Sequence, residues 1–498
     1  MLDLLVIGGG INGAGIARDA AGRGMKVALV EKDDLASHTS SASTKLVHGG
    51  LRYLENYEFR LVREALRERE VLLRIAPHLV RPMRFVLPHD AGLRPKWMLR
   101  TGLFLYDRLG GRGSLPRSRG IYLRDPSHGD VLQNRFTHGF EYSDCWVDDA
   151  RLVVLNAMDA RERGVQVLTR TRCIALERAG DHWRATLRAG GRGKTVRARA
   201  VANAAGPWVD DVADMATGGQ AQAHLRLVKG SHIVIRRKFM GEHAYIFQNR
   251  DGRIVFAIPY EHDFTLIGTT DQLFEGDRDA VAISDDERDY LCAAASEYFS
   301  EPVTPADVIS TYAGIRPLYE DNAASNATVT RDYVFDVDAP AGDQGVSTAP
   351  LLSVYGGKIT TYRRLAEHAL DRLGKHVDVP GRPWTADAAL PGGDFAESFD
   401  AFLGEIRALW PWLPDATARR MARAYGTRIE RVIGRAKSLA ELGRDCGGGM
   451  TEAEVDYLRR EEFAQTADDV LWRRGKLGLH LGDKAHENVT AALARHYA

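Results

Sequence analysis

The sequence lacks several features that mark particular classes of protein. Its 498 residues include four cysteines that lie far apart and form no CxxC pair: Cys145, Cys173, Cys292 and Cys446. A disulfide framework or a structural zinc site is therefore not expected, and a reducing compartment fits best. The 67 basic and 67 acidic side chains cancel, which excludes a globally basic nucleic-acid binder. We predict a protein with no bound metal and no nucleic-acid partner.

Long apolar runs are also missing. No run approaches the ~18–20 residues that cross a bilayer, and the N-terminal residues MLDLLVIGGG have neither the basic region nor the cleavage site of a signal peptide. We therefore expect a cytoplasmic protein or one attached to a membrane surface. The composition is otherwise that of a globular chain, with 44% hydrophobic and 27% charged residues, and the length predicts two or three domains.

The N-terminal segment has the pattern of a β-α-β unit that binds a dinucleotide. An apolar strand over residues 3–7 is followed at once by glycines, an alanine-rich helix and a second apolar strand. Gly8, Gly10 and Gly13 occupy the G-x-G-x-x-G positions, which allow a tight turn, close approach of a pyrophosphate and close packing of helix on strand. Glu31 ends the second strand, where an acid binds ribose hydroxyls, so FAD or NAD is favoured over NADP. A plain glycine turn is the alternative.

Two further glycine-rich segments carry polar side chains. Residues 37–45 are rich in serine and threonine and lead into the turn of His48, Gly49 and Gly50. Hydroxyl groups there can bond phosphate or flavin oxygens, and the glycine pair lets the backbone lie against a flat ring; a serine-rich surface loop is the alternative. Farther on, a strand over residues 351–355 runs into a glycine pair and a helix, which again directs a helix N-terminus at a ligand.

Residues 93–112 combine cations with bulky apolar side chains. The segment alternates Arg94, Lys96, Arg100, Arg108 and Arg112 with Trp97, Met98, Leu99, Leu103, Phe104 and Leu105. Such a helix suits the headgroup zone of an anionic bilayer, and a buried helix with surface arginines is the alternative. The apolar periodicity of residues 59–75 predicts an amphipathic helix of the scaffold.

The middle and the end of the chain predict two further domains. Short β-rich runs between residues 226 and 269 predict a mostly antiparallel sheet inserted within the dinucleotide-binding domain. Helical periodicity dominates from about residue 395 to the end of the chain, which predicts a separate C-terminal α-domain.

Taken together, the motifs resemble those of one flavoprotein family. HGGLRYL, EYSDCWVDDARL and GGKITTYR are the most specific, and KGSHIV, IGTTD, YAGIRPL and DDVLWRRGKLGL extend the match over nearly the whole chain. The chain is similar to the FAD-dependent glycerol-3-phosphate dehydrogenases of the D-amino-acid-oxidase-like superfamily. The resemblance implies an α/β fold with a Rossmann-like FAD-binding domain (1–75, 145–215 and 311–378), an inserted, mainly antiparallel substrate-binding domain with a membrane-facing segment (76–144 and 216–310), and a C-terminal all-α domain (390–498).

The resemblance also implies a reaction. sn-Glycerol 3-phosphate would be oxidised at its C2 alcohol to dihydroxyacetone phosphate, with FAD reduced and then reoxidised by a membrane quinone. Such chemistry needs a hydride acceptor, a proton acceptor and cations for the phosphate. Arg52, Arg316 and Lys358 lie beside glycine or proline in turn-like segments, as a phosphate clamp requires. The resemblance places these three residues and Tyr53 around the substrate phosphate.

Two histidines are candidates for the proton acceptor. His48 in HGG and His232 in KGSH each carry an imidazole suited to this role, and either can instead be a structural histidine. Arg316 is counted with the catalytic residues, and Thr270 is a candidate for a hydrogen bond to substrate or flavin. The residues expected to contact FAD are Gly8, Gly10, Asn12, Gly13, Glu31, Ser40, Ser41, Ser43, Lys45, Leu46, His48, Gly49, Gly206, Trp208, Gly357, Lys358, Ile359 and Thr360.

Three other functions stay open at this point. An amino-acid or amine oxidase that passes electrons to oxygen has the same fold, although three cations favour a phosphate. A glycerol-3-phosphate oxidase that releases hydrogen peroxide and a non-catalytic flavin protein that senses redox state are the others. A quinone partner would place the enzyme at the cytoplasmic face of the membrane, attached peripherally through residues 93–112. The oligomeric state, a homodimer included, is left open.

Overall fold

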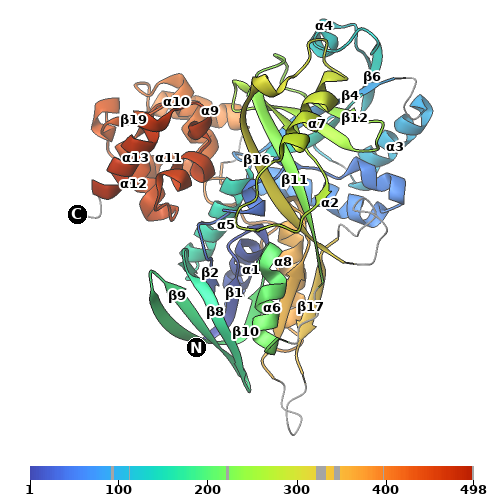
Figure 1. Cartoon of the computed structure of the whole chain (residues 1–498). Coiled ribbons are helices and arrows are strands. Elements are labelled where there is room, and N and C mark those ends of the chain that lie inside the picture. The colour runs from blue at the N-terminus through green and yellow to red at the C-terminus, as the bar shows by residue number, and fades with distance from the viewer. Residues whose placement is uncertain are drawn as a thin grey trace.

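The computed structural model describes residues 1–90, 95–111, 113–219, 224–320, 332–340, 348–395 and 398–495 (Figure 1). This part of the chain forms two large sheets with helices packed on them, and a C-terminal group of helices at one side (Figure 1). None of the helices described there combines the length and the apolar character needed to span a bilayer.

The first sheet has a parallel centre. Its strand order is β17 (Val334–Asp338), β18 (Leu351–Tyr355), β10 (Arg192–Asn203), β1 (Leu2–Ile7), β2 (Val27–Val30) and β7 (Gln166–Leu168), and β8 (Arg172–Ala179) and β9 (His182–Ala189) extend it from β10. The strands from β18 to β7 in this order run parallel, and β17 is an antiparallel edge. Parallel sheets of this kind are covered on both faces, which explains the continuous apolar run of β1.

Two cores lie on opposite faces of this sheet. Leu4 and Val6 of β1 pack with α1 (Ile11–Gly22), α5 (Asp149–Glu162) and α8 (Tyr362–Leu373). Leu5 and Ile7 pack with the β8–β9–β10 ribbon and with α6 (Val209–Thr217). Successive side chains of a strand point to opposite faces, so β1 contributes to both cores and its carboxyl end is held rigidly where the glycine turn begins.

The second sheet is antiparallel except for the pair β4–β12. Its order is β15 (Gln272–Leu273), β11 (Leu225–Arg236), β14 (Phe264–Gly268), β13 (Ile254–Tyr260), β12 (Ala244–Gln248), β4 (Val80–His89), β6 (His138–Val147) and β3 (Leu46–Val47), with β16 (Val308–Tyr319) paired to β11 and β5 (Arg119–Tyr122) paired to β6. One face is covered by α7 (Asp285–Ser296), the other by α2 (Phe59–Ile75) and α3 (Lys96–Leu109). The short α4 (Pro126–Gly129) follows β5.

The C-terminal helices have a core of their own. They are α9 (Phe399–Leu409), α10 (Asp415–Tyr425), α11 (Ile429–Ile433), α12 (Glu452–Glu461) and α13 (Asp483–Arg495), with the hairpin β19 (Asp445–Gly447) and β20 (Met450–Thr451) and a π-helical turn, η9 (Asp469–Arg474). In Figure 1 these helices, drawn in orange and red, stand beside the part of the molecule that holds α5 and β2.

The predicted fold class is confirmed: a doubly covered α/β sheet, an inserted antiparallel sheet and a C-terminal helical unit. The amphipathic helix predicted at 59–75 is α2, and the segment 93–112 forms α3, while Arg94 and Arg112 lie outside the described residues. One boundary differs. Residues 311–319, assigned from the sequence to the first domain, belong to β16, because its pairing with β11 continues to Tyr319. β3 likewise joins the second sheet from within the range 1–75.

Candidate cofactor and substrate site

A cavity of about 510 Å³ is lined by residues of both sheets. Ile7, Val30 and Ala204 reach it from the carboxyl ends of β1, β2 and β10, and the second sheet contributes Phe256 and Arg316. The carboxyl ends of parallel strands are where ligands bind in open α/β sheets. The cavity therefore lies where the predicted dinucleotide site should lie, and the second sheet forms its far wall.

The glycine turn after β1 has the geometry that its spacing predicts. A Cβ atom on Gly8, whose φ is +112°, would lie 2.3 Å from the carbonyl oxygen of Ala204, and one on Gly13 would lie 1.9 Å from the carbonyl oxygen of Gly8. Gly10 instead lines the cavity just before α1, where such a Cβ, its chain neighbours aside, would meet Ser40 Oγ at 3.0 Å and no other atom of the described residues within 4 Å. Gly8 and Gly13 thus serve backbone packing, and Gly10 leaves room for a ligand at the helix N-terminus.

Glu31 stands at the end of β2 and lines the cavity. Its carboxylate accepts hydrogen bonds from the backbone N–H groups of Gly9, at 2.6 Å, and Asp33, at 2.8 Å. Burial raises the pKa of this carboxyl group, and the two backbone donors offset part of the rise. Each oxygen keeps a second lone pair, so the group can accept from ribose hydroxyls as the sequence predicts.

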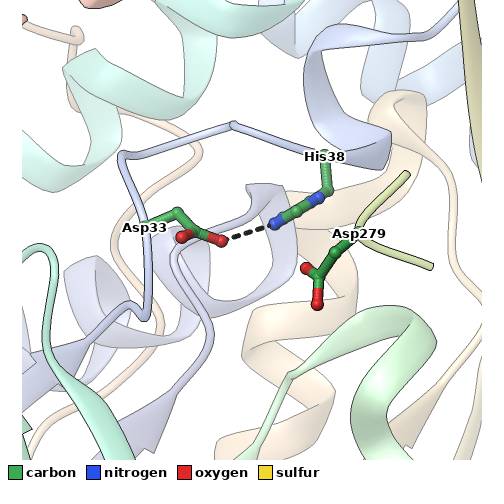
Figure 2. Close-up of side chains that lie close together, drawn as sticks. All are labelled: Asp33, His38 and Asp279. Atoms are coloured by element: carbon green, nitrogen blue, oxygen red, sulfur yellow. Dashed lines mark hydrogen bonds and ion pairs between the residues drawn. The ribbon is translucent and has the colours of Figure 1, made fainter. Parts of the chain in front are cut away.

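Figure 2 shows a cluster of Asp33, His38 and Asp279, of which His38 lines the cavity. His38 Nε2 lies 2.8 Å from Asp33 Oδ2, and this hydrogen bond holds the pKa of Asp33 below its ordinary value. The Lys32 ammonium donates to both carboxylates, at 2.6 Å and 2.5 Å, and lies over the Trp208 ring. The Lys32 ammonium therefore offsets one of the two negative charges, and the cluster is an ion-pair network that joins a loop of the first sheet to a loop of the second.

The serine-rich segment and the HGG turn form the wall expected to face the flavin. Ser40, Ser43, Leu46 and His48 line the cavity. The other predicted contacts that line it follow β10 and β18 or sit in the first turn of α1: Gly206, Trp208, Gly357, Lys358, Ile359, Thr360 and Asn12. The backbone N–H of His48 donates to Thr360 Oγ1 at 3.2 Å, which joins the two walls.

Four residues predicted to contact the cofactor do not line the cavity: Gly13, Ser41, Lys45 and Gly49. The Lys45 ammonium is buried and donates to the carbonyl oxygen of Ser41, at 2.6 Å, and to Asp149, at 2.7 Å. The Gly49 N–H donates to the Tyr106 hydroxyl at 2.8 Å. A buried charge or N–H group needs a hydrogen-bond partner, and the partners of Lys45 and Gly49 are protein groups. These two residues therefore support the cavity wall and do not line the cavity themselves.

Three cations, Arg52, Arg316 and Lys358, also line the cavity. Arg52 and Tyr53 lie in the short helix η2 (Leu51–Asn56), and Lys358 places its ammonium 3.9 Å from the centre of the Tyr53 ring. Arg316 of β16 donates to the Thr270 carbonyl oxygen at 2.7 Å and lies 3.4 Å from Asp271 Oδ1. The four predicted phosphate-binding residues are thus brought to one cavity from three separate segments: η2, β16 and the turn after β18.

The Thr270 hydroxyl has protein partners. It donates to Glu287 Oε1 at 2.7 Å and accepts from the Ser231 N–H at 2.9 Å, and the residue is fully buried. The hydroxyl proton is therefore already donated to Glu287 and is not available to a substrate or flavin. At the cavity, Thr270 contributes its carbonyl oxygen, which orients Arg316.

His232, on β11, is held in the wall of the cavity. Its ring stacks on Tyr312 with centroids 4.6 Å apart, and Nε2 lies 3.0 Å from Thr44 Oγ1. Nδ1 is buried without a hydrogen-bond partner among the described residues. Burial lowers the pKa of His232 well below its ordinary value, and the charges of Lys45 and Arg316 lower it further. The imidazole is therefore neutral near pH 7, the form that accepts a proton.

The fold and the site together define a flavoprotein oxidoreductase. Its features are a dinucleotide site formed by the glycine turn and Glu31, a doubly wound sheet and an inserted antiparallel sheet. The family model described as "FAD dependent oxidoreductase" matches residues 3–363, and the model described as "C-terminal domain of alpha-glycerophosphate oxidase" matches residues 383–497. The chain belongs to the FAD-dependent oxidoreductase family, in the group that includes the glycerol-3-phosphate dehydrogenases. The predicted family, enzyme class and cofactor, FAD, are confirmed.

Relatives in this group are similar along nearly their whole length. The chain is 52% identical to D-erythritol 1-phosphate dehydrogenase of Brucella abortus, with 96% of this chain and 95% of that protein covered. It is 52% identical to glycerol-3-phosphate dehydrogenase of Pseudomonas aeruginosa, with 96% and 92% covered. Among solved structures, glycerol-3-phosphate dehydrogenase from Bacillus halodurans complexed with FAD has a TM-score of 0.80 at 29% identity, with 100% of this chain and 91% of that chain covered.

The residues of the cavity fit FAD. Gly10 leaves a space at a helix N-terminus that a Cβ atom would narrow, where a pyrophosphate is favoured. Asn12 donates through its Nδ2 to the Gly356 carbonyl oxygen, and its Oδ1 is buried without a partner among the described residues. Gly10, Asn12 and Glu31 would hold the pyrophosphate and ribose, and the segment from Ser40 to His48 would lie along the flavin.

Three residues of the site were not predicted from the sequence. Asp271 pairs with Arg316, Tyr312 stacks on His232 and Thr44 hydrogen-bonds to it. All three lie within motifs of the family or next to predicted residues, so their position in the sequence was the one signal that could have indicated them. Their roles could not be predicted, because they depend on contacts between segments far apart in the sequence.

Proposed function

We propose that the chain oxidises the C2 alcohol of glycerol 3-phosphate to the ketone, giving dihydroxyacetone phosphate. The observation that carries this proposal is that one cavity presents three cations, Arg52, Arg316 and Lys358, and a neutral buried histidine, His232, beside the FAD cradle. Cations bind a phosphate dianion, and a neutral imidazole takes the proton of the alcohol.

The residues divide the work as follows. FAD, when bound, supplies the acceptor of the hydride. Arg52 and Lys358 hold the phosphate, with Lys358 steered by the Tyr53 ring. Arg316, fixed by the Thr270 carbonyl and Asp271, lines the same cavity as His232 and would stabilise the charge that develops on the substrate oxygen. His232 accepts the hydroxyl proton, and Thr44 fixes the orientation of its ring.

A second substrate has a specific observation in its favour. The relative from Brucella abortus, 52% identical to this chain, is named for D-erythritol 1-phosphate. A polyol phosphate of this kind presents the same groups to the cavity, a phosphate dianion and a secondary alcohol, on a chain one carbon longer. The cations alone do not separate the two substrates.

Steady-state turnover of the purified holoenzyme with a soluble quinone analogue tests the substrate. We expect kcat/KM to be highest for glycerol 3-phosphate, lower for D-erythritol 1-phosphate and undetectable for glycine. A higher value for the erythritol ester would replace the substrate within the same class. Turnover of glycine alone would refute the phosphate clamp.

We also propose that the electrons pass to a membrane quinone. The support is the surface of α3, which exposes Trp97 (68%), Met98, Phe104 and Leu105 beside its cations. The same helix is anchored from behind by the buried residues Leu103 and Tyr106. Exposed aromatic and basic side chains on one helix suit a bilayer surface.

The chain segment at the cavity carries exposed rings as well. Tyr57, which follows η2, is 80% exposed, and Phe59 at the start of α2 is 40% exposed. Because η2 also contains Arg52 and Tyr53, a bilayer that contacts these rings would lie close to the catalytic cavity. We therefore propose peripheral attachment at the cytoplasmic face of the membrane. Oxygen uptake by the holoenzyme without quinone should be negligible, and a rapid oxidase reaction would refute the quinone.

A further inference from the structure

The C-terminal helices contact the chain segment that follows β2. This segment, residues 31–38, begins with Glu31 and contributes Ser37 and His38 to the cavity. It also touches the glycine turn, because the Ala36 N–H donates to the Gly9 carbonyl oxygen at 3.1 Å. The position of residues 31–38 therefore determines where Glu31 and the glycine turn stand relative to each other.

Asp34, in the middle of this segment, is held by the C-terminal π-helical turn η9. Its carboxylate accepts from both terminal nitrogens of Arg474, at 2.8 Å for Nη2, and from Arg473 Nε at 2.6 Å. Asp34 and Arg474 are 2% and 1% exposed. A buried carboxylate is tolerated only with such partners, so this pair fixes the segment in one position.

A second contact reaches the segment from its other side. Asp469, the first residue of η9, is fully buried and accepts from Arg170 at 2.8 Å and 3.0 Å. The Arg170 N–H donates to the Asp33 carbonyl oxygen, and the next residue, Thr171, donates to the Glu31 carbonyl oxygen, both at 2.7 Å. Thr171 itself lines the cavity. The turn η9 thus holds residues 31–38 in two ways: directly, through Asp34, and indirectly, through Arg170.

A third buried contact leads toward the flavin wall. Arg151 of α5 forms a two-pronged pair with Glu462, at 2.6 Å and 2.8 Å, in the loop that precedes η9. Two residues earlier, Asp149 receives the Lys45 ammonium and the Ser43 hydroxyl, both at 2.7 Å. The helix that anchors the serine-rich segment is therefore held by the same C-terminal domain.

Other ion pairs between the C-terminal domain and α5 lie away from the cavity. Glu162, at the end of α5, accepts from Arg428 at 2.7 Å and from Arg431 at 3.4 Å, and these side chains are partly exposed. They join the same two parts of the molecule without touching residues 31–38. A variant that removes these ion pairs is therefore a matched control, because it weakens the attachment of the C-terminal domain to α5 without changing a contact of residues 31–38.

We infer that the C-terminal domain is part of the cofactor site, because Asp469, Arg473 and Arg474 hold residues 31–38 in the position that binds the adenosine half of FAD. These are positioning residues, which act through Asp34 and Arg170. The inference rests on the proposed placement of FAD along Gly10 and Glu31. A segment fixed before the ligand arrives loses less freedom on binding, so FAD is held more tightly.

The test measures release of FAD from diluted holoenzyme by the recovery of flavin fluorescence, in the full-length chain. Asp34→Asn removes the charge that Arg473 and Arg474 share and should speed release about tenfold or more. Arg473→Gln should give a smaller increase, and Glu162→Gln should leave release unchanged. The KM for glycerol 3-phosphate at saturating FAD should stay within about twofold of the wild type.

The melting temperature of each variant separates a merely structural role from the inferred one. If Asp34→Asn and Arg473→Gln lower the melting temperature as Glu162→Gln does, but release FAD at the wild-type rate, the inference is overturned. If Asp34→Asn does not fold, Arg473→Gln decides, since the Arg473 side chain is partly exposed. FAD release needs no substrate, so faster release in an enzyme that fails to oxidise glycerol 3-phosphate would support the inference while refuting the proposed function.

Discussion

Replacement of His232 by glutamine tests the proposed base. Glutamine keeps a polar group that can hydrogen-bond to Thr44, but it cannot take up a proton. General-base catalysis contributes about 10²- to 10⁴-fold, which at about 1.36 kcal/mol per decade is about 2.7–5.4 kcal/mol of the barrier. We expect flavin reduction by glycerol 3-phosphate to slow by that factor, measured by anaerobic stopped-flow absorbance.

The same residue predicts the pH dependence. His232 is 2% exposed and stacked on Tyr312, and burial together with Lys45 and Arg316 lowers its pKa well below the ordinary 6.5. The imidazole therefore stays neutral and able to accept a proton as the pH falls through 6.5. The acid limb of kcat/KM for the wild type should lie well below pH 6.5, and the limb that belongs to His232 should be absent from the variant.

Two controls accompany this variant. The absorbance spectrum of the purified protein shows whether FAD is still bound, so that loss of cofactor is not mistaken for loss of the base. His48→Gln removes the other candidate histidine, and we expect a smaller loss of rate than in His232→Gln. Flavin reduction in His232→Gln within fivefold of the wild type, or an acid limb at or above pH 6.5, would show that the reasoning about the base is wrong.

Three further variants test other parts of the account. Lys358→Met should raise the KM for glycerol 3-phosphate about 10- to 100-fold without altering the slow turnover of unphosphorylated glycerol; an equal loss with both substrates would exclude a phosphate contact. Lys96→Glu with Arg108→Glu removes about 1 kcal/mol of attraction per cation, so binding to anionic vesicles in a sedimentation assay should weaken about 30-fold or more. Arg188→Glu on β9, at the opposite end of the molecule (Figure 1), should not weaken that binding. His78 is buried with a pKa lowered to about 3, so protonation of the unfolded chain below pH 6.5 takes up to about 1.4 kcal/mol per pH unit from the free energy of unfolding. Between pH 7 and pH 5, the free energy of unfolding of His78→Leu, measured by urea titration, should therefore fall by about 2 kcal/mol less than that of the wild type. The same pH dependence in both proteins would contradict the lowered pKa of His78.

The cofactor end of the site was predictable because its signals are local. Gly8, Gly10 and Gly13 act within one turn, and Glu31 follows at the end of the next strand. Each of these positions depends on backbone geometry that the spacing of residues already expresses. The same holds for α2, whose apolar periodicity gave its bounds.

The surroundings of His232 were not predictable in this way. Its contacts come from Thr44, Tyr312 and Gly268, and the Gly268 backbone lies so close that a Cβ atom there would be 2.0 Å from the imidazole ring. The contacts with Gly268 and Tyr312 exist only because β11 pairs with both β14 and β16. Register between strands some 35 to 80 residues apart is not expressed in local patterns. For the same reason the boundary near residue 311 was placed inside β16.

The role of the C-terminal helices shows the same limit. Their periodicity predicted a helical domain, and the motif DDVLWRRGKLGL was one of those that extended the family resemblance over nearly the whole chain. The contact of Arg473 and Arg474 with Asp34 spans more than 430 residues of sequence. Only the packed structure shows that this motif meets the segment beside Glu31.

The central claim is that a flavin and a phosphate clamp share one cavity with a neutral base. The most direct measurement adds glycerol 3-phosphate to the purified protein under strictly anaerobic conditions, without any quinone, and follows the absorbance of the bound flavin. The account predicts that the oxidised flavin bleaches as dihydroxyacetone phosphate forms, one molecule for each flavin reduced. A flavin that stays oxidised at millimolar glycerol 3-phosphate and at millimolar D-erythritol 1-phosphate would contradict it.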